Sequence, residues 1–97
     1  MTKKEKEKLF ELTYFCDIYR YQMINYTDSN PDYDKDLDGY KSFYDGFSHA
    51  MDLVLSKTGL KDEYIDYAEN MDDLNGYSSL DTLPKLDNPF EIPDILN

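Results

Sequence analysis

The chain has 97 residues, with 21 acidic against 10 basic side chains and a formal net charge of −11. Its 40% of hydrophobic residues is too high for a fully disordered chain, and its charge should repel nucleic acid and anionic membranes, so its natural partners are basic. No run of about 18 apolar residues could span a bilayer, nothing resembles a signal peptide, and Cys16 lacks a partner for an internal disulfide. We therefore expect a single cytoplasmic domain over residues 1–97.

A first helix is predicted over residues 3–26. Thr2 and Glu5 have the spacing of a capping box, which satisfies backbone N–H groups at a helix start. Apolar residues then recur three and four apart, as on one side of an α-helix. They are Leu9, Leu12, Cys16, Tyr19, Met23 and Tyr26. The lysine-rich start opposes the helix dipole, so we expect the first turn to fray.

A second, longer helix is predicted over residues 31–57, after a polar connection at 27–29. Asn30 can cap it, Pro31 suits its first position, and Gly59 can end it in the left-handed conformation. Its apolar residues alternate four and three apart. They are Tyr33, Leu37, Tyr40, Tyr44, Phe47, Met51 and Val54. Two amphipathic helices with so short a connection should form a long antiparallel hairpin.

Two further lines of residues are predicted on this second helix. Asp34, Asp38, Asp45 and Asp52 fall within a narrow arc on the side away from the apolar stripe, and we call them the acidic ridge. Gly39, Gly46 and Leu53 form a line between ridge and stripe. Because glycine inside a helix costs about 1 kcal/mol relative to alanine, two glycines one heptad apart suggest close approach of another backbone.

A shorter third helix is predicted over residues 61–74, and Asn75-Gly76 marks its end. Its apolar stripe is Leu60, Tyr64, Tyr67, Met71 and Leu74. The tail, residues 77–97, holds three prolines that exclude a long helix but remains apolar. It either lies across the hairpin as an extended strap, which we favour, or docks on a partner. The predicted fold class is all-α: a long antiparallel helical hairpin, a shorter third helix and an extended apolar C-terminal tail.

Residues 34–45 resemble the calcium-binding loop of EF-hand proteins. The resemblance implies a set of Ca²⁺ ligands at loop positions one, three, five, seven and twelve. They are the side chains of Asp34, Asp36, Asp38 and Asp45 and the carbonyl of Tyr40. Lys41 stands where the family has an apolar residue, and the helical stripe continues through the loop. We therefore favour an acidic helix face and expect no metal or cofactor.

Catalytic groups are sparse in this sequence. Ser48 or Ser56 with His49 would have to supply a nucleophile and base, but they are neighbours on one helix, without an evident oxyanion loop. Cys16 lies in the first apolar stripe and is expected to be a small core residue. No glycine-rich phosphate loop occurs. The sequence therefore predicts a protein that is not an enzyme.

The acidic surface is the main functional signal. Of the 21 acids 15 are Asp, although Glu is the better helix former, so solubility and helicity alone do not explain the choice. Short carboxylates on a rigid helix hold charge at fixed positions and can replace the phosphates in a basic groove. The predicted partner is a basic, nucleic-acid-binding protein of a host cell. The predicted contact residues are Asp28, Asp32, Asp34, Asp38, Asp45 and Asp52.

In composition the whole chain resembles small acidic proteins carried by phages and mobile elements of low-GC Gram-positive bacteria: it is short, rich in Lys, Asp, Asn and Tyr, and has no export signal. Such proteins include inhibitors of host defence, among them anti-CRISPR proteins and DNA mimics. The resemblance implies a phage-type inhibitor. Two alternatives remain open: a structural or assembly protein whose tyrosine-rich stripes form a homo-oligomer such as a homodimer, and a calcium-binding protein.

Overall fold

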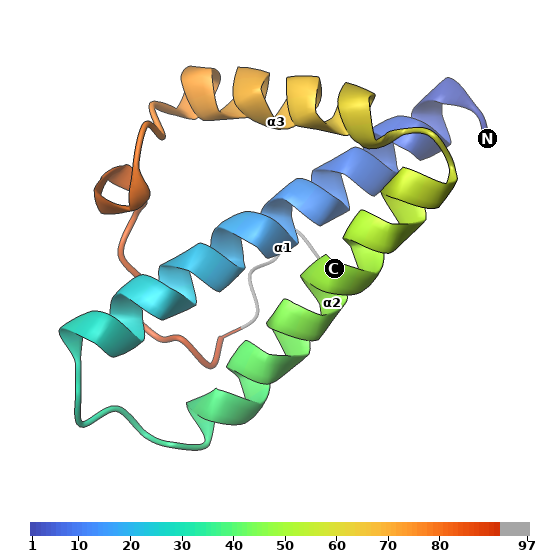
Figure 1. Ribbon diagram of the computed structural model, residues 1–97. Helices are drawn as coiled ribbons and strands as arrows, with labels where there is room; N and C mark the ends of the chain where they lie inside the picture. The colour runs from blue at the N-terminus through green and yellow to red at the C-terminus, as the bar shows by residue number, and fades with distance from the viewer. Residues whose placement is uncertain (92–97) are drawn as a thin grey trace.

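A computed structural model describes residues 1–91, and within them the protein is all-α, as predicted. The helices are α1 (Lys3–Ser29), α2 (Leu37–Lys57) and α3 (Lys61–Asn75), followed by the short 3₁₀ turn η1 (Leu80–Thr82). Figure 1 shows α1 and α2 running in opposite directions as a hairpin, with α3 crossing over the N-terminal part of α1.

Local sequence signals set most helix ends. The predicted capping box is confirmed: the Thr2 hydroxyl accepts from the Glu5 N–H at 3.1 Å, and the Glu5 carboxylate accepts from the Thr2 N–H at 3.2 Å. Gly59 and Gly76, with φ of +74° each, follow α2 and α3 in the left-handed conformation. The predicted stops of the second and third helices are therefore confirmed, because glycine adopts this conformation without steric cost.

The start of α2 was predicted wrongly. The structure begins α2 at Leu37 rather than at residue 31, and α1 continues to Ser29, so the connection is residues 30–36 rather than 27–29. Polar groups hold this turn instead of a helix: the Asn30 carbonyl accepts from the Tyr33 N–H at 2.9 Å, and the Asp34 carboxylate accepts from the Asp36 N–H at 3.0 Å. Short side chains that bond the nearby backbone compete with helix formation, which outweighs Pro31 as a start signal.

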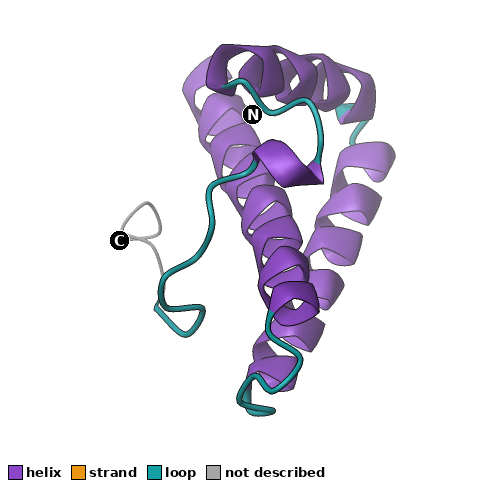
Figure 2. Cartoon of the chain, turned by 90° about the vertical axis from the view of Figure 1, so that its left-hand side faces the viewer, coloured by secondary structure: helices purple, strands orange, loops and turns teal. Residues whose placement is uncertain are grey.

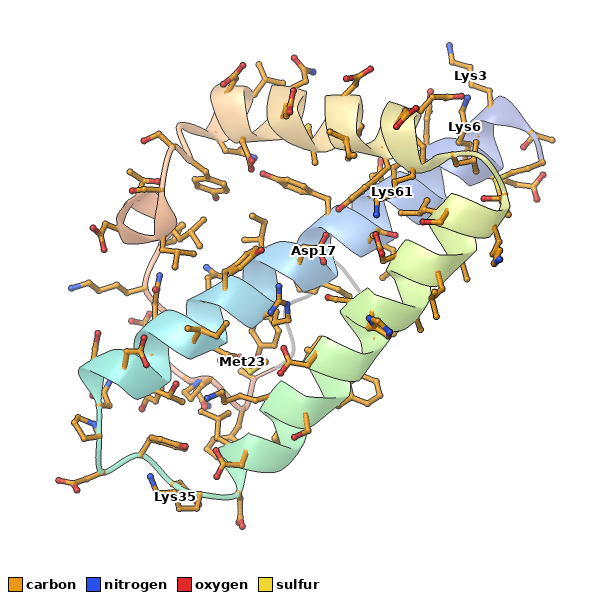
Figure 3. The ribbon with its side chains drawn as sticks, in the orientation of Figure 1. Lys3, Lys6, Asp17, Met23, Lys35 and Lys61 are labelled. Carbon is orange, nitrogen blue, oxygen red and sulfur yellow. The ribbon has the colours of Figure 1, made fainter. Side chains whose placement is uncertain are left out.

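The hairpin is held by a core cluster near its turn. Cys16, Tyr19 and Met23 of α1 pack with Leu37 and Tyr44 of α2. Met23 and Leu37 have no exposed surface, and Met23 lies between the two helices (Figure 3). The Cys16 prediction is confirmed: the residue is 3% exposed, and burial, with the nearby Asp17 charge, raises the pKa of its thiol to about 11.

A second core cluster joins all three helices at the opposite end of the hairpin. Phe10 and Tyr14 of α1, Leu55 of α2 and Tyr64 of α3 are its buried members, and the rings of Phe10 and Tyr64 meet edge to face at 5.5 Å. Of these buried members the predicted stripes included only Tyr64, but Leu9, Tyr67 and Met71 of the stripes pack half-buried against the cluster. α1 packs against both α2 and α3, so its buried residues occupy a wider part of the helix surface than the single predicted stripe.

Some predicted stripe residues are exposed instead. Tyr40 and Val54 of α2 are 41% and 43% exposed, and Leu12 of α1 and Leu74 of α3 also face solvent. Leu37 and Tyr44 of the predicted α2 stripe are buried, and Leu55, which lies outside that stripe, is buried with them. The spacing of apolar residues thus predicted each helix correctly, but it predicted only in part which side of the helix its neighbours bury.

The described part of the tail, residues 77–91, forms the predicted strap. After η1 it descends along one side of the helices (Figure 2). The Tyr19 hydroxyl donates to the Pro89 carbonyl at 2.6 Å, and the Gln22 amide donates to the Pro84 carbonyl at 2.9 Å. Leu83 is buried, while Leu86 and Phe90 pack against the cluster near the turn. The remainder of the predicted tail, residues 92–97, lies outside the described residues.

Candidate partner-binding surface

The six predicted contact residues fall into two groups in space. Asp28 is in the last turn of α1, Asp32 and Asp34 lie in the connection, and Asp38 is in the first turn of α2, so these four share the turn end of the hairpin. Asp45 and Asp52 lie further along α2. The predicted ridge as one continuous helical line is wrong, because Asp34 precedes α2.

Asp45 and Asp52 are engaged within the protein. Asp45 pairs with the Arg20 guanidinium of α1 at 3.2 Å, and Asp52 pairs with the Lys61 ammonium at the start of α3 at 2.8 Å. Both carboxylates therefore lie at the junction of α2 with its neighbours, and each has a cation beside it. A partner would have to compete with these pairs for the two charges.

Tyrosine hydroxyls bind aspartates across the contact between α1 and α3. Tyr64 of α3 donates to Asp17 of α1 at 2.7 Å, and Tyr14 of α1 donates to Asp72 of α3 at 2.7 Å. Burial first, and then the hydrogen bonds to aspartate, raise the pKa of both tyrosines well above the usual value near 10. A third bond, from Tyr33 to Asp38 at 2.6 Å, closes the turn. Part of the Asp and Tyr surplus is therefore structural.

A polar cavity of about 500 Å³ opens between the three helices. Its lining includes Asp17 and Arg20 from α1, Ser48 and His49 from α2, and Tyr64 from α3. The Nε atom of Arg20 and the Oγ atom of Ser48 are buried, and neither has a hydrogen-bond partner within residues 1–91. No hydrogen bond in this part of the chain joins Ser48 to His49.

The geometry does not match an EF-hand loop. Only Asp34 and Asp36 of the implied ligands precede α2; Asp38, Tyr40 and Asp45 belong to its helix, so residues 37–45 cannot curl around an ion as a loop does. Within residues 1–91 no three His, Cys, Asp or Glu side chains come together as a metal site would require. The calcium interpretation of residues 34–45 is therefore contradicted by the helix that runs through them.

A row of exposed carboxylates on α3 was not predicted as a site. Its members are Asp62, Asp66, Glu69 and Asp73, and we call them the α3 acidic row. Their spacing of four, three and four places all of them on one side of α3. Within the described residues none of the four makes a side-chain hydrogen bond or ion pair, in contrast to Asp45 and Asp52. The four-three-four spacing was visible in the sequence and could have identified this row.

The turn group has a mixed environment. Asp28, Asp32, Asp34 and Asp38 are all exposed, but Lys35 lies over the Tyr33 ring at 3.6 Å and adds a positive charge among them. On α3 the only basic residue is Lys61, at its start. The α3 acidic row is therefore the more uniformly negative of the two exposed surfaces.

Residues 1–91 contain no helix that is both long and apolar enough to cross a membrane. No protein-family model, no curated protein and no solved structure matches this chain. The resemblance to phage-type inhibitors stays a prediction.

Proposed function

We propose that the protein is an acidic inhibitor that occupies a basic, nucleic-acid-binding surface of a cytoplasmic partner, and that the α3 acidic row makes the central contact. The observation that carries this proposal is that Asp62, Asp66, Glu69 and Asp73 are exposed on one side of a helix with no ion pair inside residues 1–91. Carboxylates already paired within the chain have less to gain from a partner, because their charge is partly neutralised.

The spacing of the row suits a contact with several cationic side chains. At about 1.5 Å of rise per residue, successive carboxylates are separated by about 6, 4.5 and 6 Å along α3. Duplex DNA carries one charge per about 1.7 Å of its axis, so the row supplies fewer charges than the phosphates that it would replace. The turn group, with Asp28, Asp32, Asp34 and Asp38, provides a second exposed set that could extend the contact.

Binding of this kind has measurable properties. Association should be fast because the net charge of −11 steers the protein toward a basic surface. Affinity should fall as salt rises, since the contacts are exposed to solvent and are screened. Duplex DNA should compete with the protein for the same surface. None of these properties is expected of a protein whose carboxylates serve only to keep it soluble.

The test begins with capture of the partner. The immobilised protein is incubated with a nuclease-treated bacterial lysate, and bound proteins are eluted with duplex DNA and identified by mass spectrometry. The affinity of the purified partner is then measured for the natural protein and for a variant with Asp62→Asn, Asp66→Asn, Glu69→Gln and Asp73→Asn. We expect the affinity of this variant for the partner to fall at least 10-fold, which corresponds to about 1.4 kcal/mol. Each of the four exposed charges contributes about 0.2–1 kcal/mol, so together they can account for this loss.

The matched control removes the same charge from the turn group, by Asp28→Asn, Asp32→Asn, Asp34→Asn and Asp38→Asn. Asparagine keeps the side-chain oxygens that accept hydrogen bonds in the turn. An equal loss in both variants would mean that only net charge matters and that α3 has no special role. No loss in either variant, with a partner still bound, would show that the acidic surfaces are not the contact and would reject the proposal.

A further inference from the structure

One side of α2, which we call its outer side, carries large apolar side chains that residues 1–91 leave largely exposed. Phe43, Leu53 and Val54 are 63%, 51% and 43% exposed, and Tyr40 beside them is 41% exposed. In Figure 1 α2 forms one edge of the molecule. Phe90 of the tail contacts this side through the Tyr40 ring, edge to face at 5.5 Å. Exposed apolar side chains grouped on one helix are typical of an interaction surface, whereas scattered ones are ordinary.

Small residues lie among these large ones. A Cβ atom added at Gly39 or Gly46 would meet nothing within 4 Å, so no described part of the chain uses the space that these glycines leave. Glycine inside a helix costs about 1 kcal/mol relative to alanine. Along this side of the helix the order is Gly39, Phe43, Gly46, Ala50 and Val54. The small residues leave hollows beside the projecting side chains of Phe43 and Val54.

The charges of α2 are distributed unevenly around it. Its acidic residues Asp38, Asp45 and Asp52 lie on the opposite side from Phe43. The outer apolar side carries one charge at each end: Asp36, just before the helix, and Lys57, in its last turn. Asp36 lines the same shallow hollow as Gly39 and Phe43, which places its carboxylate beside the apolar side chains.

We propose that this outer side of α2 binds the same side of α2 in a second copy of the chain, antiparallel, as a symmetric dimer. A two-fold axis between Gly46 and Phe47 brings residue n of one copy opposite residue 93 − n of the other. Phe43 then faces Ala50, and Gly39 faces Val54, so these two large side chains each meet a small residue. Tyr40 faces Leu53, which adds an apolar contact. Each contact occurs twice because a two-fold interface is built from the same patch on both copies.

The same register pairs the end charges. Asp36 of one copy lies opposite Lys57 of the other, and this also occurs twice. A parallel arrangement would instead bring Asp36 to Asp36 and Lys57 to Lys57, which is repulsive at both ends. Charge and side-chain size thus select one orientation, and the partner that satisfies both is a second copy. This proposal does not depend on the proposed function, because the α3 acidic row has no part in it.

The first measurement is the mass of the full-length protein by sedimentation equilibrium, over a range of about 100-fold in concentration. We expect a shift from 11.5 kDa toward twice that value as concentration rises. Phe43→Asp should hold the mass at the monomer value while circular dichroism remains helical, since Phe43 is exposed in the single chain. A natural protein that stays monomeric at every concentration would overturn the proposal.

Charge-reversal variants test the register and orientation. Asp36→Lys alone and Lys57→Asp alone should each weaken self-association by about 10-fold, because two attractive pairs become repulsive. The Asp36 side chain makes no capping hydrogen bond, so its replacement removes no bond from the helix start, and circular dichroism of each variant checks that α2 stays helical. An equimolar mixture of the two single variants should restore the dimer as a heterodimer, and the double variant should restore it as a homodimer.

The control is Asp62→Lys on α3, which changes the charge equally but lies outside the proposed interface; it should keep at least the natural degree of dimerisation. Native mass spectrometry of the mixture distinguishes heterodimers from homodimers. If Asp36→Lys and Lys57→Asp dimerise as well as the natural protein, or if mixing them restores nothing, the dimer uses another surface or register and the proposal is wrong.

Discussion

The acidic residues of α2 and those of α3 have similar spacing in the sequence but different surroundings in the fold. Asp45 and Asp52 of α2 lie beside Arg20 and Lys61 at the helix junction, whereas the α3 acidic row faces solvent. Asp72, one residue from the end of that row, accepts a hydrogen bond from Tyr14 instead. The two helices show that a carboxylate on the side facing a neighbouring helix bonds to that helix. A carboxylate on the opposite side remains available to a partner.

The largest expected effect comes from titrating the tyrosines that bind inward-facing aspartates. Burial and the nearby Asp17 raise the pKa of Tyr64 in the folded protein above its value near 10 in the unfolded chain. The folded state therefore holds this proton more tightly, and the stabilisation is complete below pH 10. Above pH 10, the free energy of unfolding should fall by about 1.4 kcal/mol per pH unit for this group.

Urea unfolding at a series of pH values between 8 and about 12 measures this loss. The matched variant is Tyr64→Phe, which cannot ionise at this position, so its stability should decline less steeply in the same range. Equal slopes for the natural protein and the variant would show that the Tyr64 proton does not stabilise the packing of α1 against α3.

A smaller effect is expected from the loss of the same hydrogen bond at neutral pH. Tyr64→Phe keeps the ring in the core cluster but removes the donor to Asp17, and a hydrogen bond to a charged group contributes about 1.5–3 kcal/mol at most. Because Asp17 can regain water in the polar cavity, we expect a loss of about 1–2 kcal/mol in urea unfolding. If the variant were as stable as the natural protein, the bond to Asp17 would contribute nothing to the packing of α1 against α3.

The smallest effects compare one carboxylate from each helix directly. Asp52→Asn removes the ion pair with Lys61 and should lower stability by about 0.2–1 kcal/mol. Asp66→Asn should leave stability unchanged or raise it by about 0.2–0.5 kcal/mol, because it relieves repulsion from Asp62 four residues earlier. Differential scanning calorimetry at low salt shows whether each variant is less or more stable than the natural protein. Equal destabilisation by both substitutions would contradict the distinction between the carboxylate that is paired with Lys61 and the one that has no ion pair within residues 1–91.

Local signals in the sequence predicted the helices well. The capping box at Thr2, the left-handed glycines at 59 and 76 and the four-three apolar spacing each act within a few residues, so they could be read without the fold. The strap was predicted from its prolines and apolar residues, and the contacts of Pro84 and Pro89 with α1 bear this out. The failure at Pro31 is also local, since Asn30 and Asp34 bond the backbone of the turn.

The candidate sites were less accessible to sequence reasoning. A helical period shows which residues share a side of a helix but not which side another helix will cover. Arg20 and Asp45 are 25 residues apart, and Tyr14 and Asp72 are 58 residues apart, so their pairing depends on the crossing of helices. The sequence therefore marked Asp45 and Asp52 as available charges, although the fold gives each of them a cation.

By itself the sequence determined an acidic, all-α chain with three amphipathic helices and a proline-containing apolar tail. These properties follow from composition and from interactions between residues near one another in the chain. Only the tertiary structure decided that Leu55 is buried and Leu53 exposed, that within residues 1–91 Asp52 has an ion pair and Asp66 has none, and that one side of α2 keeps exposed apolar side chains. The physical reason is that burial and pairing depend on which helix surfaces come into contact, and these contacts join residues that are distant in the sequence.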